Sequence, residues 1–135
     1  MKKTWIWIVV IVIILAGALW YAKSSGIWPS NPAAAVTAIK PVVVTNASAV
    51  FSKTGVTVSG SVGSGGAPTT YWFEYGTTLN FGMSTPAASS GNNTTLVPET
   101  AVLTGLTKNT TYYFRLGAKN KYGTTYGGVY NFVAH

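Results

Sequence analysis

The sequence predicts an all-β domain, a seven-stranded antiparallel sandwich, preceded by one N-terminal transmembrane α-helix. The first observation lies in residues 103–120, which read as a strand end, a corner and a second strand. Their second half alternates with a period of two, which is typical of a half-buried strand. The residues expected to face the core are Tyr112, Phe114, Leu116 and Ala118, and those expected to face outward are Tyr113, Arg115, Gly117 and Lys119. The second observation is an uncharged apolar run over residues 5–22.

The apolar run is long enough to cross a lipid bilayer as a helix. At 1.5 Å per residue, a helix over residues 5–22 spans about 27 Å, close to the hydrocarbon thickness of a bilayer. In lipid a helix satisfies every backbone polar group of such a segment. Trp5 and Trp7 lie at one end and Trp20 and Tyr21 at the other, as in interfacial aromatic belts. We therefore expect a single-pass anchor whose partner is membrane lipid.

The orientation and processing of this segment follow from its flanks. Lys2 and Lys3 precede the apolar run and predict a cytoplasmic N-terminus with the C-terminal domain extracellular or periplasmic. A cleaved signal peptide is the alternative, because Ala16-Gly17-Ala18 resembles a cleavage site that would remove residues 1–18. The apolar run continues beyond that site, which favours a retained anchor. The expected organisation is a membrane helix over 1–22, a Pro/Ala/Ser linker over 23–39 and a β-sandwich over 40–135.

From residue 40 onward, short apolar runs alternate with turn signals and show no helical period. Gly63 to Pro68 is expected to be a turn, and Ser89 to Asn93 a loop. Pro98 lacks an amide donor, so residues 94–103 are expected to give one or two strands. The expected strands cover 41–45, 56–62, 71–75, a short edge strand at 78–81, then 94–103, 111–119 and 129–133. About seven strands without a helix favour a two-sheet sandwich.

These residues resemble a known family. The motif Thr-Tyr-x-Phe-Glu-Tyr-Gly occurs at residues 70–76, and Leu-x-Gly-Leu-x-x-x-Thr-x-Tyr-x-x-Arg-x-x-Ala-x-Asn occurs at 103–120, followed by Gly123 and Thr124. With these motifs the chain resembles bacterial fibronectin type III domains of the exported kind over residues 40–134. The resemblance implies a seven-stranded sandwich with a tyrosine corner at Tyr112, and it transfers no catalytic residues. The chain departs from the family at the corner turn, with Lys108-Asn109 where Pro-Gly is common.

The composition limits the chemistry that the chain can perform. It has no cysteine and no aspartate, and its acids are Glu74 and Glu99, with a single histidine at His135. General acid–base catalysis and cation sites need groups that are scarce here, so we expect no enzyme activity, no metal and no cofactor. The net charge is +7, but the basic residues are scattered instead of forming a stripe. We therefore expect no nucleic-acid partner.

Alternation also predicts a candidate contact surface. If Tyr71, Phe73 and Tyr75 face the core, Trp72 and Glu74 face outward, and in the family's strand order they lie beside the strand of Tyr113 and Arg115. The candidate contact residues are Trp72, Tyr113 and Arg115, since exposed aromatic and arginine side chains are typical of interfaces. We expect Glu74 to pair with Arg115 across the strands. The alternative is that Trp72 only stacks on Arg115 or lies under a loop. Glu99 is expected to be a solvated loop charge.

Two functions from different classes fit the sequence. The first is a membrane-anchored extracytoplasmic binding or adhesion module, whose partner is another envelope protein or a cell-wall polymer. The second is a structural subunit of a cell-surface filament or membrane complex, with the apolar helix in the core and the sandwich outside. In the second case the partner is the chain itself. Neither the identity of the ligand nor the stoichiometry follows from the sequence.

Overall fold

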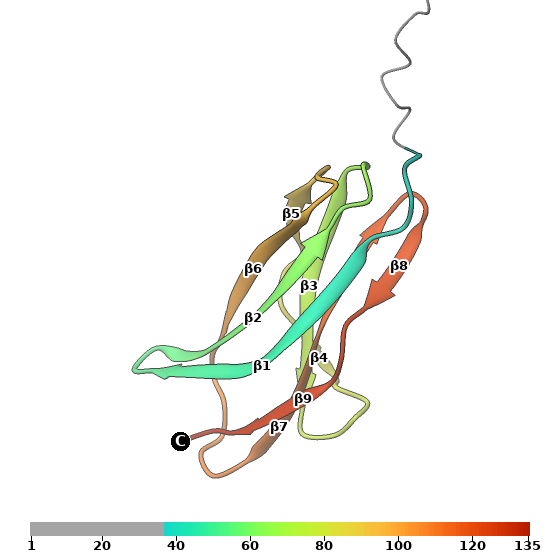
Figure 1. Ribbon diagram of the computed structural model, residues 1–135. Coiled ribbons are helices and arrows are strands. Elements are labelled where there is room, and N and C mark those ends of the chain that lie inside the picture. Colours follow the sequence, from blue (N-terminus) through green and yellow to red (C-terminus); the bar gives the residue numbers. More distant parts are fainter. Residues whose placement is uncertain (1–36) are drawn as a thin grey trace, which may run out of the picture. The chain divides into compact units, whose positions relative to one another are not determined.

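A computed structural model describes residues 37–135, and in these residues the protein is all-β (Figure 1). One antiparallel sheet has three strands, in the order β1, β2, β6. These strands are β1 (Val42–Ser52), β2 (Gly55–Gly63) and β6 (Leu96–Leu103). A hairpin joins β1 to β2, while β6 pairs with the other side of β2. The first sheet is therefore centred on β2 and has two edges.

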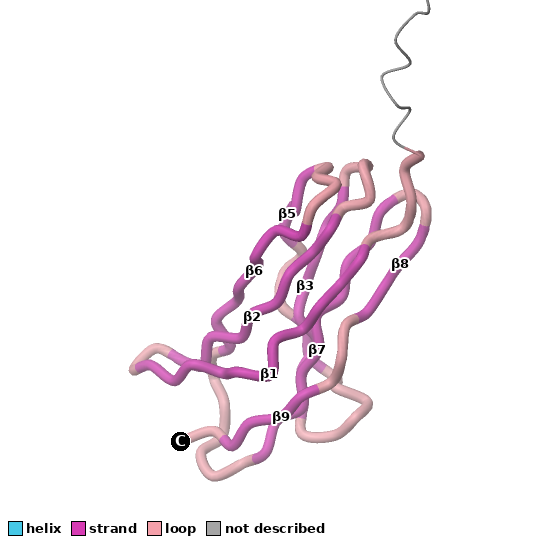
Figure 2. Tube along the Cα trace, viewed as in Figure 1, coloured by secondary structure: helices cyan, strands magenta, loops and turns pink. Residues whose placement is uncertain are grey.

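The second antiparallel sheet has six strands and is built around β3 and β7 (Figure 2). Its strands are β3 (Thr69–Gly76), β4 (Met83–Ser84), β5 (Ala88–Gly91), β7 (Thr111–Asn120), β8 (Gly123–Tyr126) and β9 (Tyr130–Val133). β3 and β7 pair along their length, from Thr70 with Lys119 to Gly76 with Tyr113. The short strands β4 and β5 pair with β3, and β8 and β9 pair with β7.

The core lies between the two sheets and confirms the period-two prediction. Tyr112, Phe114, Leu116 and Ala118 on β7 are all buried, as is Phe73 on β3. From β2 and β6 the core receives the fully buried side chains of Val58, Val62 and Leu103. Phe114 and Phe132 pack with ring centroids 5.8 Å apart. Each long strand thus turns one set of alternate side chains inward, as a two-sheet fold requires.

The corner before β7 is held by a tyrosine hydroxyl. The Tyr112 Oη accepts a hydrogen bond of 3.1 Å from the backbone amide of Thr107, five residues earlier. Asn109 has a φ of 56° at the turn, a left-handed conformation that asparagine tolerates better than most residues. Its amide donates to the carbonyl of Ala134 at 2.7 Å. The Lys108-Asn109 pair therefore makes a turn that is tied to the segment after β9.

Two hydrogen bonds hold Ile39 where the chain enters the domain, and a third joins their partners. The Ile39 amide donates to the Gly65 carbonyl at 2.9 Å, and the Ile39 carbonyl accepts from the Asn120 Nδ2 at 2.8 Å. The same Asn120 amide group donates to the Ser64 carbonyl at 3.1 Å. This arrangement, the Asn120 clasp, ties the chain before β1 to the β2–β3 turn and to the end of β7.

The described residues form nine strands instead of the expected seven. The predicted edge strand at 78–81 is wrong: the Phe81 amide donates to the Thr78 carbonyl at 3.0 Å in a turn, and the short strand follows at β4. The expected loop at 89–93 is partly wrong, because β5 covers Ala88–Gly91. β8 was not expected at all. β6 runs through Pro98 without interruption, since an edge strand can leave the missing amide on its unpaired side.

The predicted transmembrane helix over residues 5–22 lies outside the described residues, as do Trp5, Trp7, Trp20 and Tyr21. The first part of the predicted linker lies outside them too. Within residues 37–135 there is no helix that is long and apolar enough to cross a membrane.

Candidate functional site

Two of the three predicted contact residues, Trp72 and Arg115, meet around an ion pair on the outer face of the six-stranded sheet. Glu74 on β3 lies directly opposite Arg115 on β7 in the strand register. The Arg115 Nη2 and Nε lie 2.7 and 2.8 Å from the Glu74 Oε2. The two side chains are 28% and 20% exposed, so the pair is partly shielded from water. The predicted pairing of Glu74 with Arg115 is confirmed.

Two aromatic rings flank the arginine. The guanidinium carbon of Arg115 lies 3.9 Å from the centre of the Tyr126 ring and 4.7 Å from that of Phe81. These cation–π contacts and the ion pair together fix the position of the guanidinium group. Tyr126 itself remains 42% exposed. The Tyr126 ring therefore lies on the positioned Arg115 guanidinium and keeps an exposed side that a partner could contact.

Trp72 completes the group. It lies on β3 two residues before Glu74 and therefore on the same face of the sheet. Its Nε1–H donates to the Glu74 Oε1 at 3.3 Å, and its ring packs edge-on against Tyr126 with centroids 6.1 Å apart. Gly117 lies between the two rings, and a Cβ there would stand 2.9 Å from Tyr126 and 3.0 Å from Trp72. The glycine thus allows the rings to approach. The direct partners of Trp72 are Tyr126 and Glu74, whereas the sequence suggested Arg115 as the alternative partner.

Tyr113 lies on the same face but away from the ion pair. It is two residues before Arg115 on β7 and pairs with Gly76 on β3 and Asn131 on β9. The structure therefore brings Trp72 and Arg115 together through Glu74 and Tyr126, and it places Tyr113 further along the strand.

Two members of the group were missed from the sequence. Tyr126 lies on β8, a four-residue strand with a polar Gly-Thr-Thr start that gave no apolar alternation. Phe81 lies in a turn and has a φ of 58°, a conformation that is unusual for a residue other than glycine. The turn at Lys121 and Tyr122, between β7 and β8, was the available signal, because two strands joined by a tight turn pair side by side.

A shallow open hollow adjoins the ion pair. Its volume is about 520 Å³, and its lining includes Glu74, Leu79, Asn80, Phe81, Met83 and Arg115. The carboxylate, amide and guanidinium groups give it hydrogen-bonding capacity, and the apolar side chains give it contact area. An open surface of this kind suits an extended or branched partner better than a small molecule, which needs a site that encloses it.

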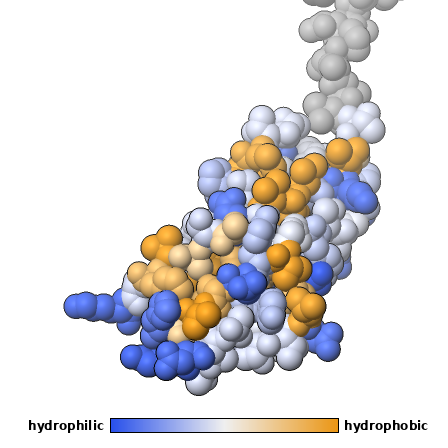
Figure 3. Space-filling model, turned by 60° about the horizontal axis from the view of Figure 1, so that its bottom comes forward, coloured by the Kyte–Doolittle hydropathy of each residue, from blue (hydrophilic) through white to orange (hydrophobic). Residues whose placement is uncertain are grey.

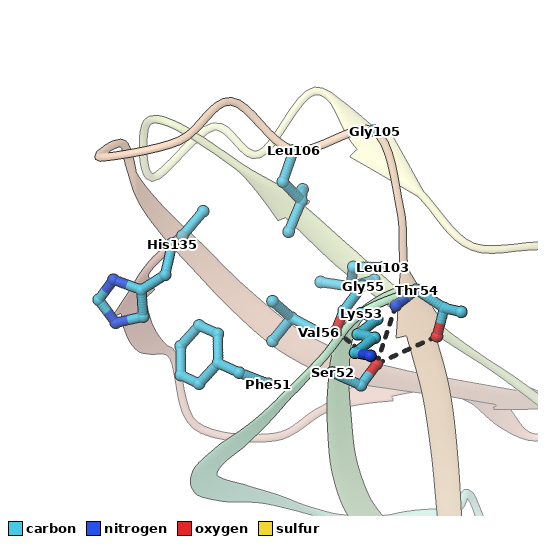
Figure 4. Close-up of a pocket in the computed structure, with 11 residues that line it drawn as sticks. Phe51, Ser52, Lys53, Thr54, Gly55, Val56, Leu103, Gly105, Leu106 and His135 are labelled. Carbon is cyan, nitrogen blue, oxygen red and sulfur yellow. Dashed lines mark hydrogen bonds between the residues drawn. The ribbon is translucent and has the colours of Figure 1, made fainter.

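A second hollow of about 560 Å³ lies at the end of the β1–β2 hairpin (Figure 4). Its floor includes the buried side chains of Val56 and Leu103, and Leu106 lies across from Phe51. The rings of Phe51 and His135 lie side by side with centroids 4.8 Å apart. The hollow is a gap between hairpin and corner loop. In residues 37–135 no group of His, Asp or Glu could hold a metal ion.

Glu99 is not the solvated loop charge that the sequence suggested. It lies within β6, half-buried, on the side of the strand that faces inward. Burial raises the pKa of the Tyr71 phenol above its ordinary value of 10.0, and the hydrogen bond to Glu99 and the charge of that carboxylate raise it further. The carboxylate therefore serves as an acceptor between the two sheets.

No protein-family model matches the chain, and no curated protein matches it significantly.

Proposed function

We propose that residues 40–135 form a fibronectin type III-like binding module that residues 5–22 hold at a membrane, outside the cytoplasm. The module works through surface contact instead of catalysis. The two antiparallel sheets and the hydrogen-bonded hydroxyl of Tyr112 support the family resemblance. The uncharged 18-residue run supports the anchor.

The cluster around Arg115 carries the proposal. Arginine, tryptophan and tyrosine are the side chains that contribute most binding energy at protein interfaces. Here Arg115 is held by Glu74 and by two rings before any partner arrives, which lowers the entropy lost on binding. The hollow beside it extends the contact area over the turn that contains Asn80. The partner that suits this surface is a cell-wall polymer or a segment of an envelope protein.

Tyr126 provides the test of this proposal. We expect Tyr126→Ala to reduce co-sedimentation of the full-length protein with purified peptidoglycan that retains its attached polymers. The reduction should be about tenfold, the usual effect of one moderate hot-spot residue. The matched control is Tyr122→Ala, because Tyr122 is a similarly exposed tyrosine at 49% but lies in the turn after β7. Equal binding by both variants and by the unchanged protein, with intact folding, would remove this site from the proposal.

A second function is favoured by a different observation, the exposed apolar side chains on the outside of the three-stranded sheet. In this case the chain is a structural subunit of a filament or membrane complex, with the apolar helix in the core and the sandwich outside. The full-length protein in mild detergent distinguishes the two functions. Discrete oligomers or fibres in electron micrographs support the subunit, and a monomer that retains cell-wall material supports the binding module.

A further inference from the structure

The outer face of the three-stranded sheet carries several exposed apolar side chains. Its large apolar residues lie on the two outer strands, β1 and β6, and five of them are between 45% and 63% exposed. Pro98 is exposed as well. We call this the apolar outer face, and it comprises Val42, Val44, Val50, Leu96, Pro98 and Val102. Single exposed apolar residues are common, but a set that shares one face of a sheet marks a contact surface.

The register explains why these side chains share a face. Val58 and Val62 on β2 point into the core, so Thr57, Ser59, Ser61 and Gly63 point outward. The members of the apolar outer face lie opposite those outward residues: Val42 and Leu96 flank Gly63, Val44 and Pro98 flank Ser61, and Val50 and Val102 flank Thr57. Two apolar rows therefore border a central row of small residues. In the space-filling view, patches of apolar surface alternate with pale and hydrophilic atoms (Figure 3).

The face has two apolar ends and a polar waist. At one end the side chains of Leu96 and Val42 approach Gly63, where a Cβ would lie 3.6 and 3.7 Å from them. At the waist the Asn46 Nδ2 donates to the Ser59 Oγ at 3.0 Å. Thr100 lies opposite Ser59 on β6. Polar groups thus separate the four-residue end from the pair at Val50 and Val102.

The edges of the same sheet are poorly suited to adding a strand. Pro98 removes an amide donor from the edge strand β6. On β1 the register breaks between Thr45 and Ala49, and the Thr45 Oγ1 accepts a hydrogen bond of 3.0 Å from the Leu116 amide in the other sheet. A partner of this sheet therefore lies on its face and not along its edge.

We propose that the apolar outer face binds the same face of a second copy of the chain, about a two-fold axis through the waist at Ser59. Such an axis lays the Val42 end of one copy over the Val50 end of the other, and it lays each polar waist on the other. The residues of the face carry no charge, whereas the described residues as a whole contain six lysine or arginine residues against two glutamates. A basic domain repels its own copy least where the contacting surface is uncharged.

The size of the face sets the strength of this contact. Three strands spaced 4.8 Å apart and eight residues long cover about 400 Å² per copy, or about 800 Å² in total. Stable dimers bury about 1,200 to 2,000 Å². The contact is therefore weak between free copies and forms when copies are held close together, as on one membrane. The contact rests on the membrane anchor proposed above, which holds the copies close together, but it lies on the face opposite to the Arg115 cluster and does not depend on that cluster.

The absence of cysteine from the sequence allows a direct test of the axis. We expect the full-length Ser59→Cys protein, in mild detergent or in phosphatidylcholine vesicles, to form covalent dimers with a short bis-maleimide linker of about 8 Å, because sheets packed face to face lie about 10 Å apart, beyond the reach of a disulfide. The rate should exceed that of the Ser89→Cys protein by about tenfold, because only a residue on a two-fold axis meets its own copy. Ser89 lies on β5 in the other sheet and is exposed. Equal rates for the two variants would overturn the proposed axis.

Charge placed on the face provides the second test. We expect the double variant Val44→Lys/Val102→Lys to abolish the cross-link of the Ser59→Cys protein, since the axis would bury each lysine against an apolar side chain of the other copy, Val50 or Pro98. Val133→Lys is the matched control: Val133 is 43% exposed, close to the 45% of Val44, but lies on β9 in the other sheet. Higher salt should increase cross-linking of the otherwise unchanged Ser59→Cys protein, because screening weakens repulsion between basic domains.

The milder pair Val44→Thr/Val102→Thr keeps the side-chain shape and covers the case in which the lysine variant does not fold, as judged by circular dichroism. An unchanged cross-link in a folded double variant would contradict the self-contact. The self-contact is equally overturned if the face binds phosphatidylcholine vesicles, loses that binding in the variants and gives no accelerated cross-link. In that case the occupant is a lipid surface.

Discussion

At the scale of single residues, the most informative partly buried side chain is Tyr71. Its phenol lies between the sheets beside Glu99, and both its burial and that carboxylate raise its pKa. Because the Glu99 carboxylate accepts a hydrogen bond from the protonated hydroxyl, the fold favours the neutral phenol. An acid on one sheet and a phenol on the other thus form a polar contact at the margin of an otherwise apolar core.

This contact predicts how stability depends on pH. Above pH 10 the Tyr71 phenol of the unfolded chain loses its proton, while in the folded protein it keeps that proton to a higher pH. The unfolded state then binds fewer protons, so the free energy of unfolding decreases as pH rises above about 10. We expect Tyr71→Phe to flatten part of this decrease. Urea unfolding of both proteins between about pH 8 and 11 measures the difference.

Two further variants, Glu99→Gln and Tyr122→Phe, test whether the loss of stability above about pH 10 comes from the contact between Tyr71 and Glu99. Glu99→Gln removes the carboxylate charge and should move the midpoint of the decrease towards a lower pH. Tyr122→Phe removes an exposed tyrosine and should leave the shape of the curve unchanged. A Tyr71→Phe curve that follows the unchanged protein at every pH would show that this phenol does not contribute.

At the scale of strands and turns, the corner before β7 depends on one hydroxyl. Tyr112→Phe keeps the buried ring and removes the acceptor of the Thr107 amide. We expect the free energy of unfolding to decrease by about 0.5–1.5 kcal/mol, the net contribution of one hydrogen bond. Chemical denaturation measures this change, and Tyr130→Phe, on an exposed tyrosine of β9, is the control. Equal stability of the two variants would contradict a structural role for the corner hydroxyl.

The long strands could be predicted from the sequence because their burial follows their alternation. β2 and β7 bury every second residue over eight or more positions, and that pattern is visible in the letters. β4, β5 and β8 have two to four residues, mostly Ser, Thr, Ala and Gly, and exist because β3 and β7 offer them pairing edges. Pairing of that kind is decided by the tertiary fold and leaves no local pattern.

In the candidate site, the residues on long strands could be predicted from the sequence, and those on short strands and turns could not. Glu74 and Arg115 lie on long alternating strands, so their outward orientation and their pairing followed from the pattern. Tyr126 and Phe81 lie on a short strand and in a turn, and their positions over the guanidinium depend on how those segments fold back. Trp72 was placed on the correct strand, but its contact with Tyr126 could not be expected without β8.

At the scale of the whole molecule, the proposed anchor leads to a prediction about extraction. We expect the full-length chain to remain with membranes during washing in alkaline carbonate and to dissolve in mild detergent, since an uncharged 18-residue run inserts stably into lipid. A variant that lacks residues 1–22 should be released without detergent. Intact mass near 14.2 kDa would confirm that the N-terminal segment is retained. A mature protein that begins after Ala18 and stays in the aqueous fraction would contradict the anchor.

The Asn120 clasp has a mechanical consequence. Tension applied to the chain ahead of Ile39 does not reach β1 alone, because the Ile39 backbone is bonded to the β2–β3 turn and, through Asn120, to the end of β7. The load is therefore divided between both sheets already at Ile39. A domain tethered at this point resists being peeled open one strand at a time, which is the property that a module under pulling or shear at a surface requires.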